Sequence, residues 1–366
     1  MADRQNPFTP SFGSIPPVFA GRKYVIKEIL SGLQSGPGNP NRASLLVGAR
    51  GSGKTALLAK VAKEAGQYGW VSVRITAVSG MLEDILIQSR RNGDAFLTKE
   101  ARSHLTSIGV AGLSAGRQLT EKPLTNWRAQ MEDLVDELAQ HSVGLFITVD
   151  EIKNTDDMRI LAATFQHFVS EEKKVALLMA GLPQNVSSLL SDETVSFLRR
   201  SVQHQLGPIH EPHEVREVIR KTIELSGRSI DEVALKEAAL ATGGFPFLIQ
   251  LVGYHIWRQN PLADTIEKRD VKEGVLYAQE DMEGRILRLT VRELSDGDLQ
   301  FLLAMLEDEN ESQIADIAKR LEVSSSHAGQ YRLRLIEQGI IGGRGRGKVG
   351  FDLPMLKDYL RRTYLN

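Results

Sequence analysis

A glycine-rich run that ends in lysine and threonine is the strongest chemical signal in this 366-residue chain. Residues 48–55 read GARGSGKT and fit the pattern G-x-x-x-x-G-K-[ST]. Glycines let backbone N–H groups curl around a phosphate, and a helix beginning at Lys54 would aim the positive end of its dipole at the same anion. Lys54 can reach the β and γ phosphates, and the Thr55 hydroxyl can ligate Mg²⁺. The run therefore predicts a site for ATP or ADP with Mg²⁺, formed by Gly48, Arg50, Gly51, Ser52, Gly53, Lys54, Thr55 and Ala56.

Two acidic residues, Asp150 and Glu151, directly follow the apolar run of residues 145–149. A phosphate-binding loop needs a carboxylate at the tip of a neighbouring strand, and an apolar β-branched run is typical of a buried strand. We expect Asp150 to hold the magnesium ion together with Thr55, and Glu151 to orient and polarise the attacking water. An acidic pair that only caps the next helix is the alternative interpretation.

Composition limits the class of protein. Hydrophobic residues make up 42% and charged residues 25%, which is ordinary for a soluble globular chain of about two or three domains. The formal net charge is -1, so any surface for nucleic acid must be local. The chain has no cysteine, which excludes disulfides, thiolate metal sites and cysteine nucleophiles. The apolar runs are too short to span a bilayer, and we expect a cytoplasmic protein that does not bind membranes.

Short apolar runs alternate with helical patterns through the first half of the chain. This alternation predicts an α/β fold in which helices cover both faces of a parallel P-loop sheet. Beyond Gly207 the pattern becomes helical, and the last segment combines short helices with a glycine-rich hairpin. We expect a nucleotide-binding domain over residues 1–207 (with an extended arm at 1–17), a helical lid over 208–290 and a winged-helix domain over 291–366.

The order of these parts resembles that of AAA+ ATPases, in particular archaeal and eukaryotic replication initiators, with features of the related STAND signalling ATPases. Residues 18–22, VFAGR, resemble the F-x-G-R box that precedes the first helix in both groups, which implies that Phe19, Gly21 and Arg22 lie near the adenine. Residues 243–246, GGFP, lack the arginine of most initiator sensors and resemble the G-x-P element of STAND proteins. That resemblance implies that Gly244 and Pro246 also contact the nucleotide.

The resemblance also bears on turnover and assembly. In AAA+ proteins the strand after the magnesium acid ends in a polar sensor, but residues 177–183, LLMAGLP, offer none unless Gln184 or Asn185 reaches back. We therefore expect slow hydrolysis. Residues 197–200, FLRR, resemble the segment that carries the arginine finger, which implies that Arg199 or Arg200 stabilises phosphate charge in a neighbouring subunit of a homo-oligomer. Ordinary surface charge is the alternative.

The end of the chain follows the order of a winged helix. A helix over residues 312–321, a turn and a second helix to about residue 338 precede a hairpin whose tip reads RGRGK. The second helix would enter the major groove of duplex DNA, and the hairpin would meet the phosphate backbone. Each phosphate neutralised should add about 0.9 to the salt slope. The predicted DNA contacts are Ser326, His327, Gln330, Arg332, Arg334, Arg344, Arg346 and Lys348.

Together these features predict an ATP-binding, slowly hydrolysing AAA+ protein that binds duplex DNA under nucleotide control, as replication initiators do. Two alternatives remain. One is a STAND-like switch that uses its winged helix to hold an inactive state, and the other is a motor whose winged helix docks protein.

Overall fold

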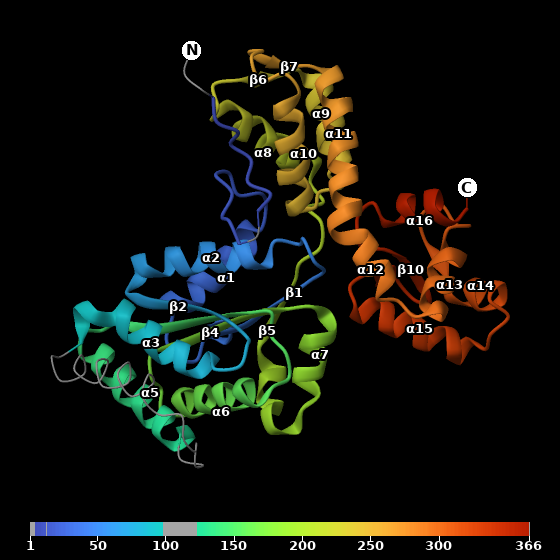
Figure 1. Cartoon of the computed structure of the whole chain (residues 1–366). Helices are drawn as coiled ribbons and strands as arrows, with labels where there is room; N and C mark the ends of the chain where they lie inside the picture. The colour runs from blue at the N-terminus through green and yellow to red at the C-terminus, as the bar shows by residue number, and fades with distance from the viewer. Residues whose placement is uncertain (1–3, 12, 98–122, 366) are drawn as a thin grey trace, which may run out of the picture.

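A five-stranded parallel sheet organises the first half of the chain (Figure 1). The computed structural model describes residues 4–11, 13–97 and 123–365. The strand order is β2-β3-β4-β1-β5, and every neighbouring pair is parallel. The strands are β1 (Ala43–Val47), β2 (Trp70–Thr76), β3 (Gly144–Asp150), β4 (Val175–Gly181) and β5 (Val202–Gln205). The predicted α/β class is therefore confirmed.

Helices cover both faces of this sheet (Figure 1). Successive strand residues face opposite sides, so Leu45 packs in one core cluster and Leu46 in the other. On the Leu46 side lie α1 (Lys23–Gln34) and α2 (Lys54–Ala65). On the Leu45 side lie α3 (Met81–Gly93), α5 (Pro123–Gln140) and α6 (Asp156–Ser170). Near the edge strand β5 lie α7 (Pro183–Ser191) and a 3₁₀ segment, η4 (Glu193–Arg200).

The sheet determines where the two predicted motifs meet. The glycine-rich run joins the carboxyl end of β1 to α2, and Asp150 is the last residue of β3. Carboxyl ends of parallel strands lie at the same edge of a sheet, and only β4 separates β1 from β3. This edge therefore brings the loop and the acid together.

A helical layer follows, within the range predicted to form the lid. Its elements are α8 (Pro212–Glu224), β6 (Ser229–Ile230), α9 (Glu232–Ala241), α10 (Pro246–Gln259), β7 (Thr265–Ile266) and α11 (Lys268–Met282). The strands β6 and β7 form a short parallel pair. The N-terminal arm lies against this layer, and the Phe8 ring is buried in its core. Arm and lid, far apart in sequence, thus form one packed unit.

The C-terminal part continues from α11 through a π-helical turn, Glu283–Leu287, into α12 (Arg288–Arg292). Its remaining elements are α13 (Asp296–Met305), β8 (Ser312–Gln313), α14 (Ile314–Arg320), α15 (Ser325–Glu337), β9 (Ile341–Gly343), β10 (Lys348–Phe351) and α16 (Leu356–Tyr364). The strands form an antiparallel sheet in the order β8-β10-β9, and β9 and β10 form the predicted hairpin. We predicted a helix from residue 312, but Ser312 and Gln313 pair with β10 instead, and the helix begins at Ile314. Within the described part of the chain, no helix has both the length and the apolar character that a membrane span requires.

Candidate nucleotide-binding site

The phosphate loop is held between β1 and the lid. Gly51 and Gly53 have φ values of +79° and +87°, a left-handed conformation that glycine adopts without a Cβ clash. A Cβ on Gly53 would lie 3.3 Å from the ring of Pro246, and one on Gly51 would lie 3.2 Å from Phe247 Cβ. The backbone N–H of Phe247 donates to the Gly51 carbonyl at 3.2 Å. The lid residues after the GGFP motif therefore pack directly on the loop.

Three polar residues predicted from the sequence meet at the loop. Lys54 Nζ lies 2.9 Å from the carbonyl oxygens of both Gly48 and Ala49. Thr55 Oγ1 donates to Asp150 Oδ2 at 2.5 Å. Burial lowers the pKa of Lys54 to about 8, although Asp150 and Glu151 oppose this effect. Burial disfavours the charged form of this ammonium group, and a phosphate bound beside it would favour the charged form again.

Glu151 adopts an unusual backbone conformation at the end of β3. Its φ is +53°, which is strained for a residue with a side chain, and its N–H donates to Asp150 Oδ1 at 2.9 Å. The side chain is exposed, while Asp150 is half-buried and anchored by two hydrogen bonds. The two carboxylates therefore differ in their surroundings. The anchored Asp150 suits the role of a metal ligand, and the exposed Glu151 suits the role of a group that acts on water.

A small pocket lies next to the phosphate loop, between the N-terminal arm, α2 and the lid. It brings together six of the residues predicted to bind nucleotide: Phe19, Arg22, Ser52, Gly53, Ala56 and Pro246. Gly21 and Gly244 lie beyond it, both against Ile209, whose N–H donates to the Gly244 carbonyl at 2.8 Å. Arg50 is exposed on the loop. The lining is mostly apolar, which suits the face of a nucleobase, and the space of about 30 Å³ must widen to admit one.

Buried polar atoms without partners support a ligand at this place. Among the described residues, Ser52 Oγ and Arg22 Nε are buried and have no hydrogen-bond partner, and both residues line the pocket. Buried polar groups are nearly always satisfied, so an orphaned group in a pocket points to a ligand or ordered water. The residues present fit Mg²⁺ with ATP: Thr55 and Asp150 supply the hard oxygen ligands that Mg²⁺ prefers, and Lys54 supplies the cation for phosphate.

The sensor position has no polar side chain in the strand itself. All residues of β4 are buried and apolar or glycine, and the strand ends at Gly181, where a Cβ would lie 2.8 Å from Ile152. Gln184 and Asn185 lie in the first turn of α7, and both are half-buried. As expected, β4 does not end in the polar sensor residue of the AAA+ pattern. The nearest polar residues along the chain lie at the start of α7.

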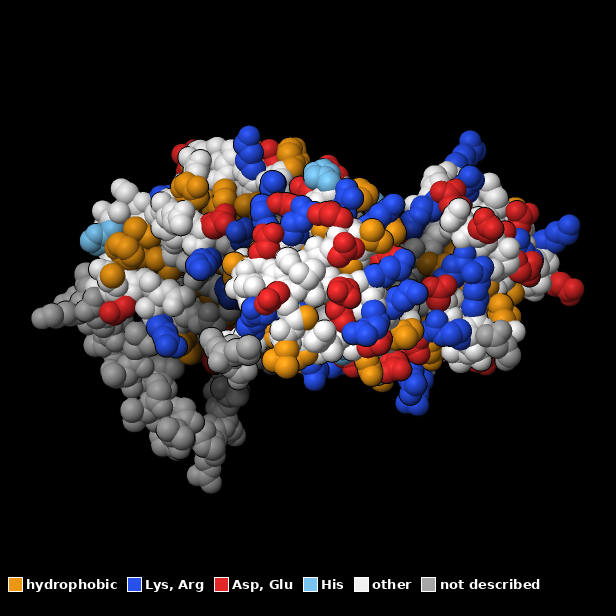
Figure 2. Space-filling model, turned by 90° about the horizontal axis from the view of Figure 1, so that it is seen from above, with side chains coloured by type: hydrophobic (Ala, Val, Ile, Leu, Met, Phe, Trp, Pro, Cys, Tyr) orange, Lys and Arg blue, Asp and Glu red, His pale blue; other side chains and the backbone are white. Residues whose placement is uncertain are grey.

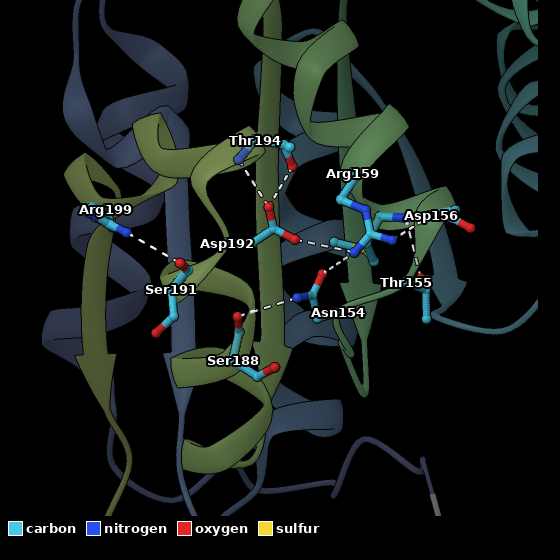
Figure 3. Close-up of polar contacts among 10 residues, drawn as sticks. Asn154, Thr155, Asp156, Arg159, Ser188, Ser191, Asp192, Thr194 and Arg199 are labelled. Carbon is cyan, nitrogen blue, oxygen red and sulfur yellow. Dashed lines mark hydrogen bonds and ion pairs between the residues drawn. The ribbon is translucent and has the colours of Figure 1, made fainter.

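The two arginines predicted as a finger differ in their contacts. Arg199 Nε donates to the carbonyl of Leu190 at 2.7 Å, and its side chain lies beside Ser191 at the end of α7 (Figure 3). Arg200 is exposed and, in the part of the chain that the structure describes, has no recorded hydrogen bond or ion pair. Arg199 is therefore held by the fold, while Arg200 is available to a neighbouring molecule.

A polar network connects this segment to the loop that follows Glu151 (Figure 3). Arg159 donates to Asn154 Oδ1 at 2.7 Å and to Asp192 Oδ2 at 3.2 Å, and it is also paired with Asp156. The Thr194 hydroxyl and N–H both donate to Asp192 and hold its pKa at about 2. The network joins the β3–α6 loop to the 3₁₀ segment that ends in Arg200.

The residues predicted to contact DNA fall into two groups. Ser326, His327 and Gln330 are exposed on the first half of α15, where the bases would be read. Arg334 is held by Asp298, a buried carboxylate of α13, at 2.9 Å. Arg332 is half-buried, and its Nε is buried without a partner among the described residues. In the second half of the helix, Arg334 is thus exposed but already paired, and Arg332 is partly covered.

Two of the three cations predicted to form a wing are paired with carboxylates. Arg344 contacts Asp352 at 2.6 Å, and Lys348 contacts Glu311 at 3.1 Å. Arg346, at the hairpin tip, has no recorded partner in the described part of the chain. On the face shown in Figure 2, Lys and Arg side chains are interspersed with Asp and Glu, in keeping with a net charge of -1. Arg346 is therefore the cation of the hairpin that is free to meet a ligand among the described residues.

The C-terminal part touches the phosphate loop. A Cβ on Gly339, just after α15, would lie 3.2 Å from Ala49 Cα. The helix α15 also packs near α7. Between the two parts runs a groove of about 960 Å³, whose lining includes Gly48, Ala49, Arg199, Ile336 and Gly339. The groove therefore joins the phosphate loop, the arginine segment and the C-terminal part.

Sequence reasoning missed several residues that line the small pocket beside the phosphate loop. Pro16, Val18, Ile249 and Gln250 line it as well. Gln250 carried a signal: it is a single polar residue in the apolar run of residues 246–252, PFLIQLV. A polar residue among apolar neighbours on a buried helix needs a partner, and that requirement could have marked it.

Comparisons with known proteins find one family model that matches part of the chain and several solved structures of low identity. A family model described as a domain of unknown function (DUF8462) matches residues 285–360. No curated protein matches the chain. The chain is similar to a single-substitution form of RuvB from Thermotoga maritima, with 17% identity and a TM-score of 0.47, over 98% of this chain and 99% of that chain.

Two further solved structures show the same level of likeness. The Orc1 protein of Aeropyrum pernix, in complex with DNA, is 16% identical with a TM-score of 0.46 over 95% of this chain and 94% of that chain. Domain III of the T. maritima replication initiation protein DnaA is 14% identical with a TM-score of 0.45 over 75% and 98%. At such low identities and TM-scores, the class, ligand and partner of this protein are argued from its own residues.

Proposed function

We propose that this chain is an ATP-dependent switch of the AAA+ type, which hydrolyses ATP slowly and binds duplex DNA through its C-terminal unit under nucleotide control. Its parts would be a nucleotide-binding domain over residues 1–207, a lid over 208–290 and a winged helix over 291–366. The contact between Ala49 of the phosphate loop and Gly339 after α15 carries this proposal.

The nucleotide chemistry follows from the residues at the sheet edge. Lys54 would neutralise the β and γ phosphates, and Thr55 and Asp150 would hold Mg²⁺, which supplies charge neutralisation on the phosphates. Glu151 would accept a proton from, or orient, the attacking water. Because β4 offers no polar sensor, turnover should be slow.

The phosphate loop would contact both the nucleotide and the C-terminal unit, and this shared position would let the nucleotide control DNA binding. The loop that would wrap the phosphates also packs against the turn after α15. Any rearrangement of Ala49 when phosphate binds changes the fit with Gly339, so the two binding events are coupled. Coupling free energies are reciprocal, and DNA bound to the C-terminal unit would change nucleotide affinity by the same factor.

DNA binding would use the exposed first half of α15 and the hairpin tip. Ser326, His327 and Gln330 offer hydrogen bonds to base edges, and Arg346 offers a cation to phosphate. Arg344 and Lys348 would exchange an acidic partner for phosphate at the surface, which costs little because exposed ion pairs are weak. Arg334 would not contact DNA but would stabilise the C-terminal unit by pairing with Asp298.

The test is fluorescence anisotropy of a random-sequence duplex at two salt concentrations, with ATP and then with ADP. We expect affinity that falls with salt and differs between the nucleotides in the natural protein but not in Lys54→Ala. Arg346→Ala should lower affinity and reduce the salt slope by about 0.9, whereas the exposed lid variant Arg269→Ala should change neither. Affinity that is equal with ATP and ADP would exclude nucleotide control.

A second candidate is a switch whose winged helix docks protein, including the chain's own nucleotide-binding domain. The packing of α15 near α7 favours it, because the second half of the predicted recognition helix faces the groove. Absence of duplex binding with either nucleotide, together with nucleotide-dependent protease sensitivity of residues 283–295, would select this candidate.

A further inference from the structure

The N-terminal arm packs against helix α10 and the loop that follows it. Arg4 pairs with Asp264 at 2.7 Å, and Asn6 Nδ2 donates to the Tyr254 carbonyl at 3.0 Å. The Phe8 ring is 3% exposed and lies so close to Gly253 that a Cβ there would overlap it at 2.2 Å. The arm then continues to Pro16 and Val18 in the wall of the nucleobase pocket. Arm and α10 thus build this wall together.

One hydrogen bond between the arm and α10 orients a polar side chain at the pocket. The backbone N–H of Thr9 donates to Gln250 Oε1 at 3.1 Å. An N–H group can bond only the oxygen of a side-chain amide, so the orientation of the Gln250 amide is settled by chemistry. Its Nε2, which carries donors only, has no recorded hydrogen-bond partner in the described part of the chain.

The surroundings of Gln250 match a base-binding wall. The residue is 8% exposed and lines the pocket with Phe19, Pro246 and Ile249. Near it, Thr9 Oγ1 is buried without a partner among the described residues, as are Ser52 Oγ and Arg22 Nε. A pocket with apolar walls and a few unsatisfied polar atoms is suited to a ligand that is flat, apolar on its faces and polar at its edge.

We propose that Gln250, oriented by Thr9, selects adenine over guanine in the nucleotide site, and this rests on the proposed function. A fixed amide NH₂ donates to an unprotonated ring nitrogen, and adenine presents one at N1. Guanine carries a hydrogen on N1 and has its acceptor, O6, one position away, so a donor fixed opposite N1 would leave both N–H groups unsatisfied. Sites that leave a buried polar group unpaired discriminate strongly.

The test replaces the donor with an acceptor of the same size. In Gln250→Glu, one carboxylate oxygen still accepts from Thr9, and the other now faces the base. We expect ATP affinity to fall roughly tenfold and GTP affinity to rise, so that the preference shrinks or inverts. Gln250→Leu should lower ATP affinity without helping GTP. Gln259→Leu, on the same helix but away from the pocket, is the matched control and should leave both affinities unchanged.

Each affinity is measured with fluorescent ATP and GTP analogues and by competition with unlabelled nucleotides. If the natural protein binds ATP but Gln250→Glu keeps the natural ATP-to-GTP ratio, the assignment of Gln250 is wrong and the phosphate-loop function stands. If the natural protein binds neither nucleotide, the proposed function and this inference both fail. A thermal unfolding midpoint close to the natural one shows that the variant is folded.

Discussion

The turn after α15 meets the phosphate loop at one point: a Cβ on Gly339 would lie 3.2 Å from both Cα and Cβ of Ala49. Gly339 has a φ of +70°, and its N–H donates to the Ile336 carbonyl at 2.9 Å, as expected just beyond a helix end. Residues separated by most of the chain are therefore in contact at the loop that would bind phosphate. A side chain at position 339 would therefore require Ala49 or the turn to shift by a few tenths of an ångström.

Substitution of Gly339 by valine should weaken ATP binding. The new side chain must displace either the turn or Ala49, and displacement of Ala49 also disturbs its carbonyl, which lies 2.9 Å from Lys54 Nζ. We expect the ATP dissociation constant of Gly339→Val to rise at least severalfold, as measured with a fluorescent ATP analogue.

The control for this prediction is Gly227→Val. Gly227 has a φ of +73°, nearly the same as Gly339, but nothing lies within 4 Å of its added Cβ. Both substitutions therefore carry similar backbone strain, and only one crowds the phosphate loop. Equal ATP affinities in the two variants would show that the contact with Ala49 does not influence the nucleotide site.

The affinity for ATP should fall as pH rises above the pKa of Lys54. Burial lowers the pKa of Lys54 from 10.5 to about 8, so the ammonium loses its proton as pH rises through about 8. Phosphate favours the charged form, and ATP affinity should therefore fall above that pH. Because ATP restores the proton, binding at pH 8.5 should take up about three quarters of a proton. Calorimetry in two buffers of different ionisation enthalpy measures this uptake directly.

Lys54→Arg supplies the control for proton uptake. A guanidinium stays protonated throughout this pH range, so residual ATP binding by this variant should involve no proton. Proton uptake of the same size in Lys54→Arg would assign the titration to another group.

The sequence predicted the parts of this protein that depend on local pattern. Alternating apolar runs and helical patterns specify a parallel sheet, and the GARGSGKT run specifies a loop between β1 and α2. The edge where Thr55 and Asp150 meet then follows from the parallel arrangement alone. These features depend on residues close together in sequence or on a general rule of sheet topology.

Contacts between distant segments could not be predicted in the same way. Arg334 has the spacing of an exposed helix face, but tertiary packing places the buried Asp298 carboxylate beside it. Gln250 and Thr9 are 241 residues apart, and neither belongs to a recognisable motif. The approach of Gly339 to Ala49 depends on how the C-terminal unit docks, which no local pattern encodes.

Substitution of Glu151 by glycine should stabilise the protein and abolish most of its ATP hydrolysis. Its left-handed backbone costs about 1 kcal/mol relative to glycine, so Glu151→Gly should raise the free energy of unfolding by about that amount. The same variant should lose hydrolysis by at least about a hundredfold, because the carboxylate that acts on water is gone. Denaturant unfolding measures the first effect, and phosphate release measures the second.

Glu151→Gln separates the two contributions. It keeps a side chain in the left-handed backbone, so its stability should match that of the natural protein, while turnover should be lost and ATP binding retained. Natural phosphate release by this variant would place the catalytic base elsewhere.

Turnover should depend on Arg200 of a neighbouring molecule. Arg199 is held by the Leu190 carbonyl, whereas Arg200 is exposed at the end of a segment that Asp192 and Arg159 brace. A finger supplied by a neighbour contributes roughly a thousandfold or more to turnover. Arg200→Ala should therefore bind ATP but release little phosphate, and Lys54→Ala should bind none. When the two variants are mixed, intact Arg200 from one can serve the nucleotide site of the other, so part of the activity should return. A mixture that stays inactive, or an Arg200→Ala protein with natural turnover, would rule out a finger at this residue.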